Sequence, residues 1–179
     1  MEKPIVVNIF GGPGAGKSTG AAYVFAQLKM VGINVELVTE FAKDKTWEHN
    51  MVALENQSYV FGKQCYRMSR CADQVKVIVT DSPLALSIIY NNDPTLGENF
   101  NQVVLDVFQS YTNLNYLLRR TKPYNPIGRN QTEEESDNIG KNIESMLTKY
   151  NIDFTVTTGD VNGYRDIVAD VLNKLEGDK

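Results

Sequence analysis

Apolar runs and stretches of helical periodicity alternate along the chain. The runs are rich in Val, Ile, Leu and Phe, as buried parallel strands usually are. Between them, apolar residues recur every three or four positions, which predicts amphipathic helices. We expect strands at 5–10, 35–38, 75–79, 115–118 and 154–156. The alternation predicts an α/β fold, a five-stranded doubly wound parallel sheet with helices on both faces.

Local signals place several helix ends. A helix that begins at Thr19 should stop near Gly32, and helical spacing also covers 57–73. Thr132 and Glu135 have the spacing of a capping box and predict a further helix start. In a sheet of this kind the loops after the strands converge at one edge, and ligands bind there.

Residues 11–18 read Gly-Gly-Pro-Gly-Ala-Gly-Lys-Ser and lie between the first predicted strand and a predicted helix. In that context Gly-x-x-x-x-Gly-Lys-Ser is a phosphate-binding loop, or P-loop. Its glycines let backbone N–H groups point at a phosphate, and the helix N-terminus adds positive charge. The alternative is a glycine-rich turn that binds nothing, but every fixed position of the motif is present. We expect ATP to contact Gly12, Gly14, Ala15, Gly16, Lys17, Ser18 and Thr19. Lys17 should reach the β- and γ-phosphates, and the Ser18 hydroxyl should bind Mg²⁺.

Composition narrows the class of protein. With 179 residues, the chain suits one α/β domain, so we expect a single domain over 1–179. The net charge of −4 argues against a long nucleic-acid surface or an anionic membrane surface. No apolar run approaches the roughly 20 residues of a membrane-spanning helix. Cys65 and Cys71 suggest reduced thiols, so we expect a cytoplasmic protein. The oligomeric state stays open, a homodimer included.

Two acids follow predicted strands, Glu40 after the second and Asp81 after the third. Phosphoryl transfer needs a metal on the phosphates and usually a carboxylate that takes the acceptor's proton. Asp81 has the position of an acid that holds Mg²⁺, directly or through water; an N-cap or turn residue is the alternative. Glu40 is the better candidate for the general base because its strand should lie farther from the P-loop. It could equally be a solvated loop carboxylate, and the two roles could be exchanged.

The stretch 119–129 holds four cationic residues, two prolines, a glycine and no acid. We interpret it as part of a lid, at about 119–132, that closes over the phosphates. Arg119, Arg120 and Arg129 are its candidates for stabilising the charge of the transition state. A solvated basic loop is the alternative.

Candidate acceptor contacts come from the region between the two acids. Gln64 and Arg67 share a predicted helix, and Lys43 lies in the polar stretch 41–55. Trp47 and Phe61 could stack on a base, although aromatics at helical spacing are more often core residues.

Taken together, these motifs resemble the P-loop nucleoside and nucleotide kinase families. The matching features are the P-loop at 11–18, Glu40 at a strand end, the Asp81-Ser82-Pro83 turn and the arginine-rich lid. The chain looks most like small AAA-type ATP-binding proteins encoded by bacteriophages, which would place it in the cytoplasm of a host cell. The resemblance implies that Glu40 is the base, that a Gln-containing helix reads a nucleobase, and that Thr158 and Asp160 lie beside the adenine of ATP. It departs at Ser82, where these kinases carry an arginine.

The resemblance and the motifs predict a Mg²⁺-dependent kinase. It would move the γ-phosphate of ATP to a nucleoside, a nucleotide or a short 5′-hydroxyl oligonucleotide, since polynucleotide 5′-hydroxyl kinases share these parts. A hydrolytic NTPase, working as a motor or switch, is the alternative. Against it, Asp81 is followed by Ser82 and not by a glutamate that could activate water. A nucleotide-binding regulator without turnover is a third hypothesis, which the intact P-loop and acids disfavour.

Overall fold

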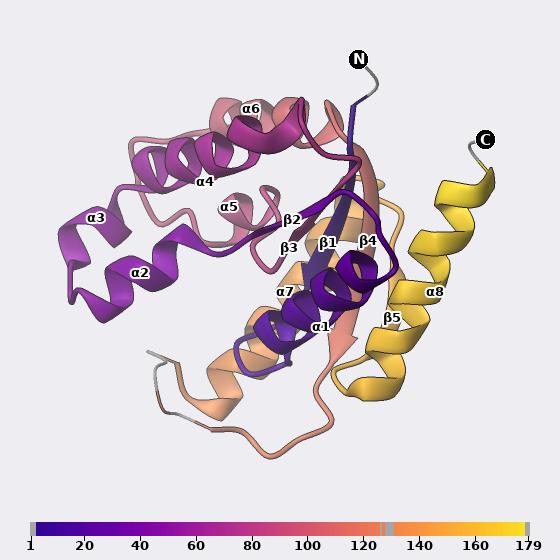
Figure 1. Ribbon diagram of the computed structural model, residues 1–179. Helices are drawn as coiled ribbons and strands as arrows, with labels where there is room; N and C mark the ends of the chain where they lie inside the picture. The colour runs from indigo at the N-terminus through magenta and orange to yellow at the C-terminus, as the bar shows by residue number, and fades with distance from the viewer. Residues whose placement is uncertain (1–2, 126, 128–130, 178–179) are drawn as a thin grey trace.

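The computed structural model describes residues 3–125, 127 and 131–177. Its centre is one sheet of five parallel strands in the order β2-β3-β1-β4-β5 (Figure 1). The register pairs Val7 with Val79 on one side and with Leu114 on the other. The strands are β1 (Ile5–Phe10), β2 (Val35–Val38), β3 (Val77–Thr80), β4 (Thr112–Arg119) and β5 (Thr155–Thr158). The predicted fold class is confirmed.

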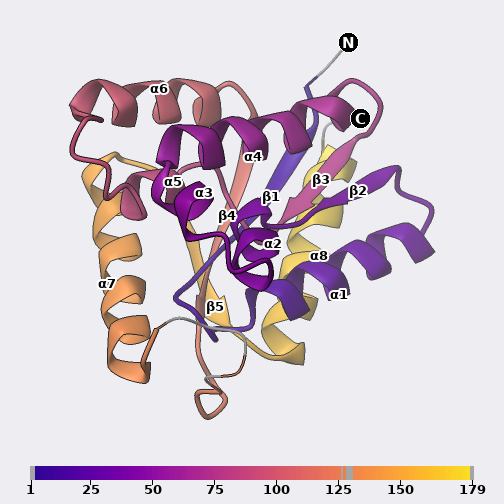
Figure 2. The same cartoon turned by 90° about the vertical axis from the view of Figure 1, so that its left-hand side faces the viewer.

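Helices cover both faces of the sheet, as Figure 2 shows, with α6 and α7 on one side and α1 and α8 on the other. Because every crossover between parallel strands needs a connecting segment, the helices alternate with the strands. Their bounds are α1 (Lys17–Met30), α2 (Phe41–Trp47), α3 (Met51–Glu55), α4 (Gln57–Ala72), α5 (Leu86–Ile89), α6 (Glu98–Gln109), α7 (Glu133–Lys149) and α8 (Val161–Gly177).

The core has two parts, one on each face of the sheet. Successive side chains of a strand point to opposite faces, so Val6 and Phe10 of β1 pack under α4, α5, α6 and α7. Ile5, Val7 and Ile9 pack under α1 and α8 on the other face. Since both faces of β1 are covered, the whole strand is buried and its end is held firmly, which fixes the start of the loop that follows.

Three elements differ from the sequence-based expectation. The polar stretch 41–55 forms two short helices, and Asn50 caps the second by accepting a hydrogen bond from the Ala53 N–H at 3.1 Å. Strand β4 begins at Thr112, three residues before the predicted start, because the polar side chain of Asn113 is satisfied by Asn8 on β1 at 2.8 Å. The strand also ends at Arg119, one residue beyond the predicted end.

The strand order determines how far each of the two acids lies from the P-loop. β3 lies between β1 and β2, so the strand before Glu40 is the sheet's edge strand and is one strand farther from the P-loop than the strand before Asp81. This confirms the expected placement. Across the part of the chain that the structure describes, none of the helices combines the length and the apolar character needed to span a bilayer.

Candidate active site

The P-loop runs from the end of β1 into α1. Gly14 and Gly16 have φ angles of 80° and 98°, in the left-handed region that residues with a Cβ rarely adopt. Gly16 is the residue directly before α1, so the backbone reverses there and presents the helix N-terminus to the loop. The Lys17 ammonium donates hydrogen bonds to the carbonyl oxygens of Gly11 at 2.9 Å and Gly12 at 3.3 Å.

Two hydroxyl groups from distant helices hold the carbonyl oxygens of the P-loop. Ser136 of α7 donates to the carbonyl of Pro13, and the buried Tyr164 of α8 donates to that of Gly16 at 3.0 Å. The packing is equally close, since a Cβ on Gly12 would lie 2.4 Å from the Ser136 carbonyl oxygen. The loop is therefore clamped between α7 and α8, and its shape is set before a ligand arrives.

The P-loop opens onto a pocket of about 590 Å³, a size usual for small-molecule sites. One end is formed by the P-loop and the start of α1, and the strand-end acids Glu40 and Asp81 form the middle. The far end is formed by α2, α3 and the residues after α5, and Ile127 and Gln131 also line the cavity. The fold thus brings the P-loop and both acids to one cavity, as the sequence predicted.

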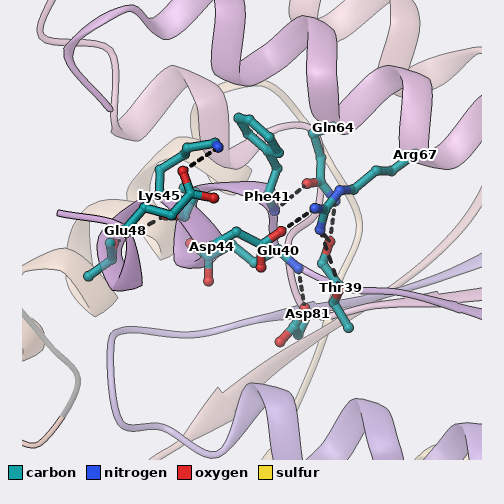
Figure 3. A network of polar contacts seen from close by, with 11 residues as sticks. Thr39, Glu40, Phe41, Asp44, Lys45, Glu48, Gln64, Arg67 and Asp81 are labelled. Carbon is teal, nitrogen blue, oxygen red and sulfur yellow. Dashed lines mark hydrogen bonds and ion pairs between the residues drawn. The ribbon is translucent and has the colours of Figure 1, made fainter. Parts of the chain in front are cut away.

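The two acids are in direct contact. The backbone N–H of Glu40 donates to Oδ1 of Asp81 at 3.1 Å (Figure 3). This contact follows from the register, in which Val38 of β2 pairs with Thr80 of β3. Burial is the main influence on the Glu40 carboxyl and raises its pKa; Lys17 lowers it, and the Asp81 carboxylate raises it again. A carboxylate made more basic in this way is well suited to accept a proton.

Gln64 and Arg67 of α4 hold the segment that carries Glu40 (Figure 3). Oε1 of Gln64 accepts from the Phe41 N–H at 2.9 Å, and its Nε2 donates to the Thr39 carbonyl at 3.3 Å. Arg67 donates to the same carbonyl at 3.2 Å and forms an ion pair with Asp44. Neither side chain lines the main pocket, so the structure places both behind the pocket wall and not at an acceptor.

Of the other three candidate acceptor contacts, two line the pocket and one does not. Lys43 and Trp47 line the pocket, and the Trp47 side chain is 61% exposed. Phe61 instead lies in the core on α4, where its ring meets that of Phe100 edge-on with centroids 5.6 Å apart. Phe61 therefore does not reach the pocket. Phe61 is a core residue, which is the alternative that its helical spacing suggested.

Two of the three candidate arginines from the predicted lid are bound to α7. Arg119 forms an ion pair with Glu144 at 2.6 Å, and Arg120 pairs with Asp137 at 2.6 Å and Glu133 at 3.0 Å. Neither arginine lines the pocket. Arg129 lies outside the described residues. The stretch 119–129 contains no acid, but acids of the next helix, α7, neutralise Arg119 and Arg120. The lack of acids within the stretch therefore did not indicate that these arginines face the pocket.

The turn after β5 packs against the P-loop. Oδ1 of Asp160 accepts hydrogen bonds from the Thr158 hydroxyl at 2.9 Å and from two backbone N–H groups at the start of α8. A Cβ on Gly159 would lie 2.0 Å from the Ala15 carbonyl oxygen. Thr158 and Asp160 thus shape a turn that touches the P-loop, and neither lines the pocket.

Ser18 and Asp81 could both supply an oxygen ligand to a metal ion at the P-loop. Both line the pocket. Mg²⁺ is usually held by one or two protein oxygens together with water and substrate phosphates, so this pair fits it. Among the residues described here, no group of three or more His, Cys, Asp and Glu side chains is placed to hold a metal ion.

Sequence reasoning missed the two P-loop anchors and the far wall of the pocket. Ser136 and Tyr164 lie 120 or more residues from the loop that they bind, and no local motif marks them. Met51, Leu54 and Glu55 were part of a stretch with no predicted element. Only the tertiary arrangement brings these residues to the site.

Comparisons with known proteins identify the family of the chain and structures with a similar fold. A family model described as an AAA domain matches residues 6–163. Thymidylate kinase from Ehrlichia chaffeensis has a similar structure, with a TM-score of 0.63 and 13% sequence identity over 96% of this chain and 98% of that one. Deoxyadenosine kinase from M. mycoides, solved with bound dATP, gives a TM-score of 0.54 and 20% identity over 96% and 99%. No curated protein matches the sequence. The fold is that of the P-loop nucleoside and nucleotide kinases, which confirms the expected resemblance.

Proposed function

The chain belongs to the AAA domain family, and we propose that it is a kinase that transfers the γ-phosphate of ATP to a small nucleoside- or nucleotide-like acceptor. The observation that carries this proposal is the single pocket that joins a complete P-loop to two strand-end carboxylates. A phosphate-binding end and a carboxylate end are the two parts that phosphoryl transfer requires.

At the phosphate end, the P-loop N–H groups and the Lys17 ammonium bind the β- and γ-phosphates. To do so, Lys17 exchanges its hydrogen bonds to the carbonyls of Gly11 and Gly12 for bonds to phosphate oxygens. Mg²⁺, held through Ser18 and Asp81, supplies positive charge that neutralises the phosphate oxygens. Thr158 and Asp160 maintain the turn beside the loop, where the adenine of ATP would lie.

At the carboxylate end, Glu40 accepts the proton of the acceptor hydroxyl as that oxygen attacks the γ-phosphorus. A new bond forms between the acceptor oxygen and the γ-phosphorus, and the bond between this phosphorus and the oxygen of the β-phosphate breaks. ADP leaves with that oxygen. The raised pKa of Glu40 favours the proton transfer.

The lid arginines would stabilise the charge of the transition state. Arg119 and Arg120 must exchange their carboxylate partners on α7 for phosphate oxygens when the lid closes. Exposed ion pairs contribute only about 0–1 kcal/mol, so a triphosphate can compete for Arg119, whose side chain is 46% exposed. Nη1 of Arg120 is buried and has no hydrogen-bond partner among the described residues.

The test is transfer of labelled γ-phosphate from ATP to a panel of nucleosides, nucleoside monophosphates and 5′-hydroxyl dinucleotides, with an acceptor-free control. Label on an acceptor, lost in Lys17→Ala, supports a kinase. Phosphate release at the same rate with and without acceptors would instead make the protein a hydrolytic NTPase.

A further inference from the structure

The far end of the pocket differs in character from the P-loop end. Its walls come from α2, α3 and the segment after α5. Trp47, Met51 and Leu54 provide aromatic and aliphatic surface, while Glu55 and Asn92 provide polar groups at its edge. An apolar cleft with a few polar groups is typical of a site that holds a ring system and orients it by hydrogen bonds.

Charge at this end favours a neutral ligand. Among the described lining residues of the far end and the middle, the charged side chains are those of Glu40, Lys43, Glu55 and Asp81. Even with Asp81 assigned to the metal ion, two carboxylates, Glu40 and Glu55, face the ammonium group of Lys43. A phosphomonoester brings a charge of about −1.5 to −2 at neutral pH, which these carboxylates would repel.

The arginines nearest to this wall are directed elsewhere. Arg67 is bound to Asp44 and to the Thr39 carbonyl. Together with Arg70 it lines a separate hollow of about 260 Å³ on the far side of the Glu40 segment. Neither guanidinium group contributes to the main pocket.

Trp47 supplies the surface on which a flat ring can rest. It is the only tryptophan in the sequence and is 61% exposed at the end of α2, although it lines the pocket. Stacking on an aromatic side chain accepts any nucleobase, since every base has a π-face. An indole exposed in this way at a cavity suits a ligand with such a ring.

We propose that the acceptor is a nucleoside with a free primary hydroxyl, and not a nucleoside monophosphate. Its base stacks on Trp47, and its hydroxyl is directed toward Glu40. The hydroxyl oxygen forms the bond to the γ-phosphorus of ATP, its proton goes to Glu40, and ADP leaves. This inference rests on the proposed kinase function and names the acceptor that the same pocket takes.

Binding can be measured without turnover, because Trp47 fluorescence reports on this site alone. Nucleosides should quench the emission saturably in the presence of ADP, whereas the matching 5′-monophosphates should bind at least tenfold more weakly. Equal or tighter binding of the monophosphates would overturn the inference. Glu55→Gln removes one carboxylate and should narrow the difference between the two ligands; an unchanged difference would contradict the charge argument.

Turnover gives the second arm. Nucleosides should have a kcat/KM at least tenfold above that of their monophosphates. Trp47→Ala should raise the nucleoside KM about tenfold or more with little change in kcat, and Trp47→Phe, which retains a ring, should restore most of the affinity. An unchanged KM in Trp47→Ala would refute stacking.

The outcomes separate the two proposals. Transfer to monophosphates with none to nucleosides sinks the acceptor assignment and leaves the kinase standing. Saturable nucleoside binding without transfer to any acceptor sinks the kinase and leaves the nucleoside site. Transfer to 5′-hydroxyl dinucleotides without transfer to nucleosides likewise overturns the nucleoside assignment and identifies an oligonucleotide end as the acceptor.

Discussion

The carboxamide of Gln64 holds the backbone on both sides of Glu40. It accepts from the Phe41 N–H at 2.9 Å and donates to the Thr39 carbonyl at 3.3 Å, so the residue between them is fixed from α4. Gln64 is buried and does not line the pocket. It is a positioning residue for Glu40, and this role can be separated from ligand contact by experiment.

Gln64→Met keeps the length of the side chain and removes both hydrogen bonds. The Phe41 N–H loses its partner, while the Thr39 carbonyl keeps the hydrogen bond from Arg67, and leaving this N–H unpaired should destabilise the protein by about 1–3 kcal/mol. Misplacement of Glu40 should lower kcat by up to about 10²-fold, while the affinity for ATP stays unchanged. Gln102→Met on the exposed face of α6 is the matched control and should alter neither quantity. A rise in the acceptor KM alone would instead indicate that Gln64 contacts the substrate.

Glu40→Gln tests the general base. The carboxamide has nearly the same shape but cannot take a proton, so the transfer rate should fall on the order of 10²–10⁴-fold. ATP binding, measured by calorimetry, should remain nearly intact, because Lys17 and the P-loop are untouched. Full activity in this variant would assign the base to Asp81, which Asp81→Asn would then test.

The same carboxyl should make stability depend on pH. Burial raises the pKa of Glu40 above its ordinary 4.5, so the folded state binds the proton more tightly than the unfolded state. Its contribution to stability is full below about pH 4.5 and is lost as the pH rises through the raised pKa. Glu40→Gln should therefore melt at a higher temperature than the unaltered protein at pH 7, with the gap closing toward pH 4.5. A gap of constant size across this range would disagree.

Tyr164→Phe tests the clamp on the P-loop. The ring stays in the core, but the Gly16 carbonyl loses its 3.0 Å hydrogen bond. We expect a loss of about 1 kcal/mol of stability and a several-fold weaker affinity for ATP, measured by calorimetry. Tyr23→Phe, in the ring that packs against Tyr164, serves as the control. Unaltered ATP affinity in Tyr164→Phe would show that the loop keeps its shape without this bond.

Gly159→Ala tests the contact between the turn after β5 and the P-loop. Its Cβ would lie 2.0 Å from the Ala15 carbonyl oxygen, a backbone atom that cannot move without the P-loop. We expect ATP binding to be lost or strongly reduced. Gly62→Ala on α4 is the counterpart, since a Cβ there meets nothing within 4 Å. It should stabilise the helix by about 0.5–1 kcal/mol and leave ATP binding as it was.

Features that depend on neighbouring residues in the chain could be predicted. The P-loop motif, the strand before it and the acids at the strand ends are all local, so the pocket's P-loop end and its middle followed from the sequence. The capping box of Thr132 and Glu135 is local as well, and the structure contains both of its hydrogen bonds.

Features that depend on packing could not be predicted. Trp47 and Phe61 gave similar signals, yet one lines the pocket and the other faces Phe100, because only the docking of α4 on the sheet decides between them. Gln64 was recognised as a polar residue on a helix, but its partners are backbone groups 23 and 25 positions earlier. The acids that bind Arg119 and Arg120 lie 13 to 25 residues farther along the chain.

The clamp of the P-loop between α7 and α8 also sets a condition on biosynthesis. The carbonyls of Pro13 and Gly16 leave the ribosome 123 and 148 residues before their respective partners Ser136 and Tyr164. Until residue 136 has emerged, neither carbonyl has its hydroxyl partner, and until residue 164 has emerged, the Gly16 carbonyl still lacks that of Tyr164. A nascent chain arrested before that point should therefore bind ATP more weakly than the released protein, because the nucleotide site is completed only after α8 has begun to emerge.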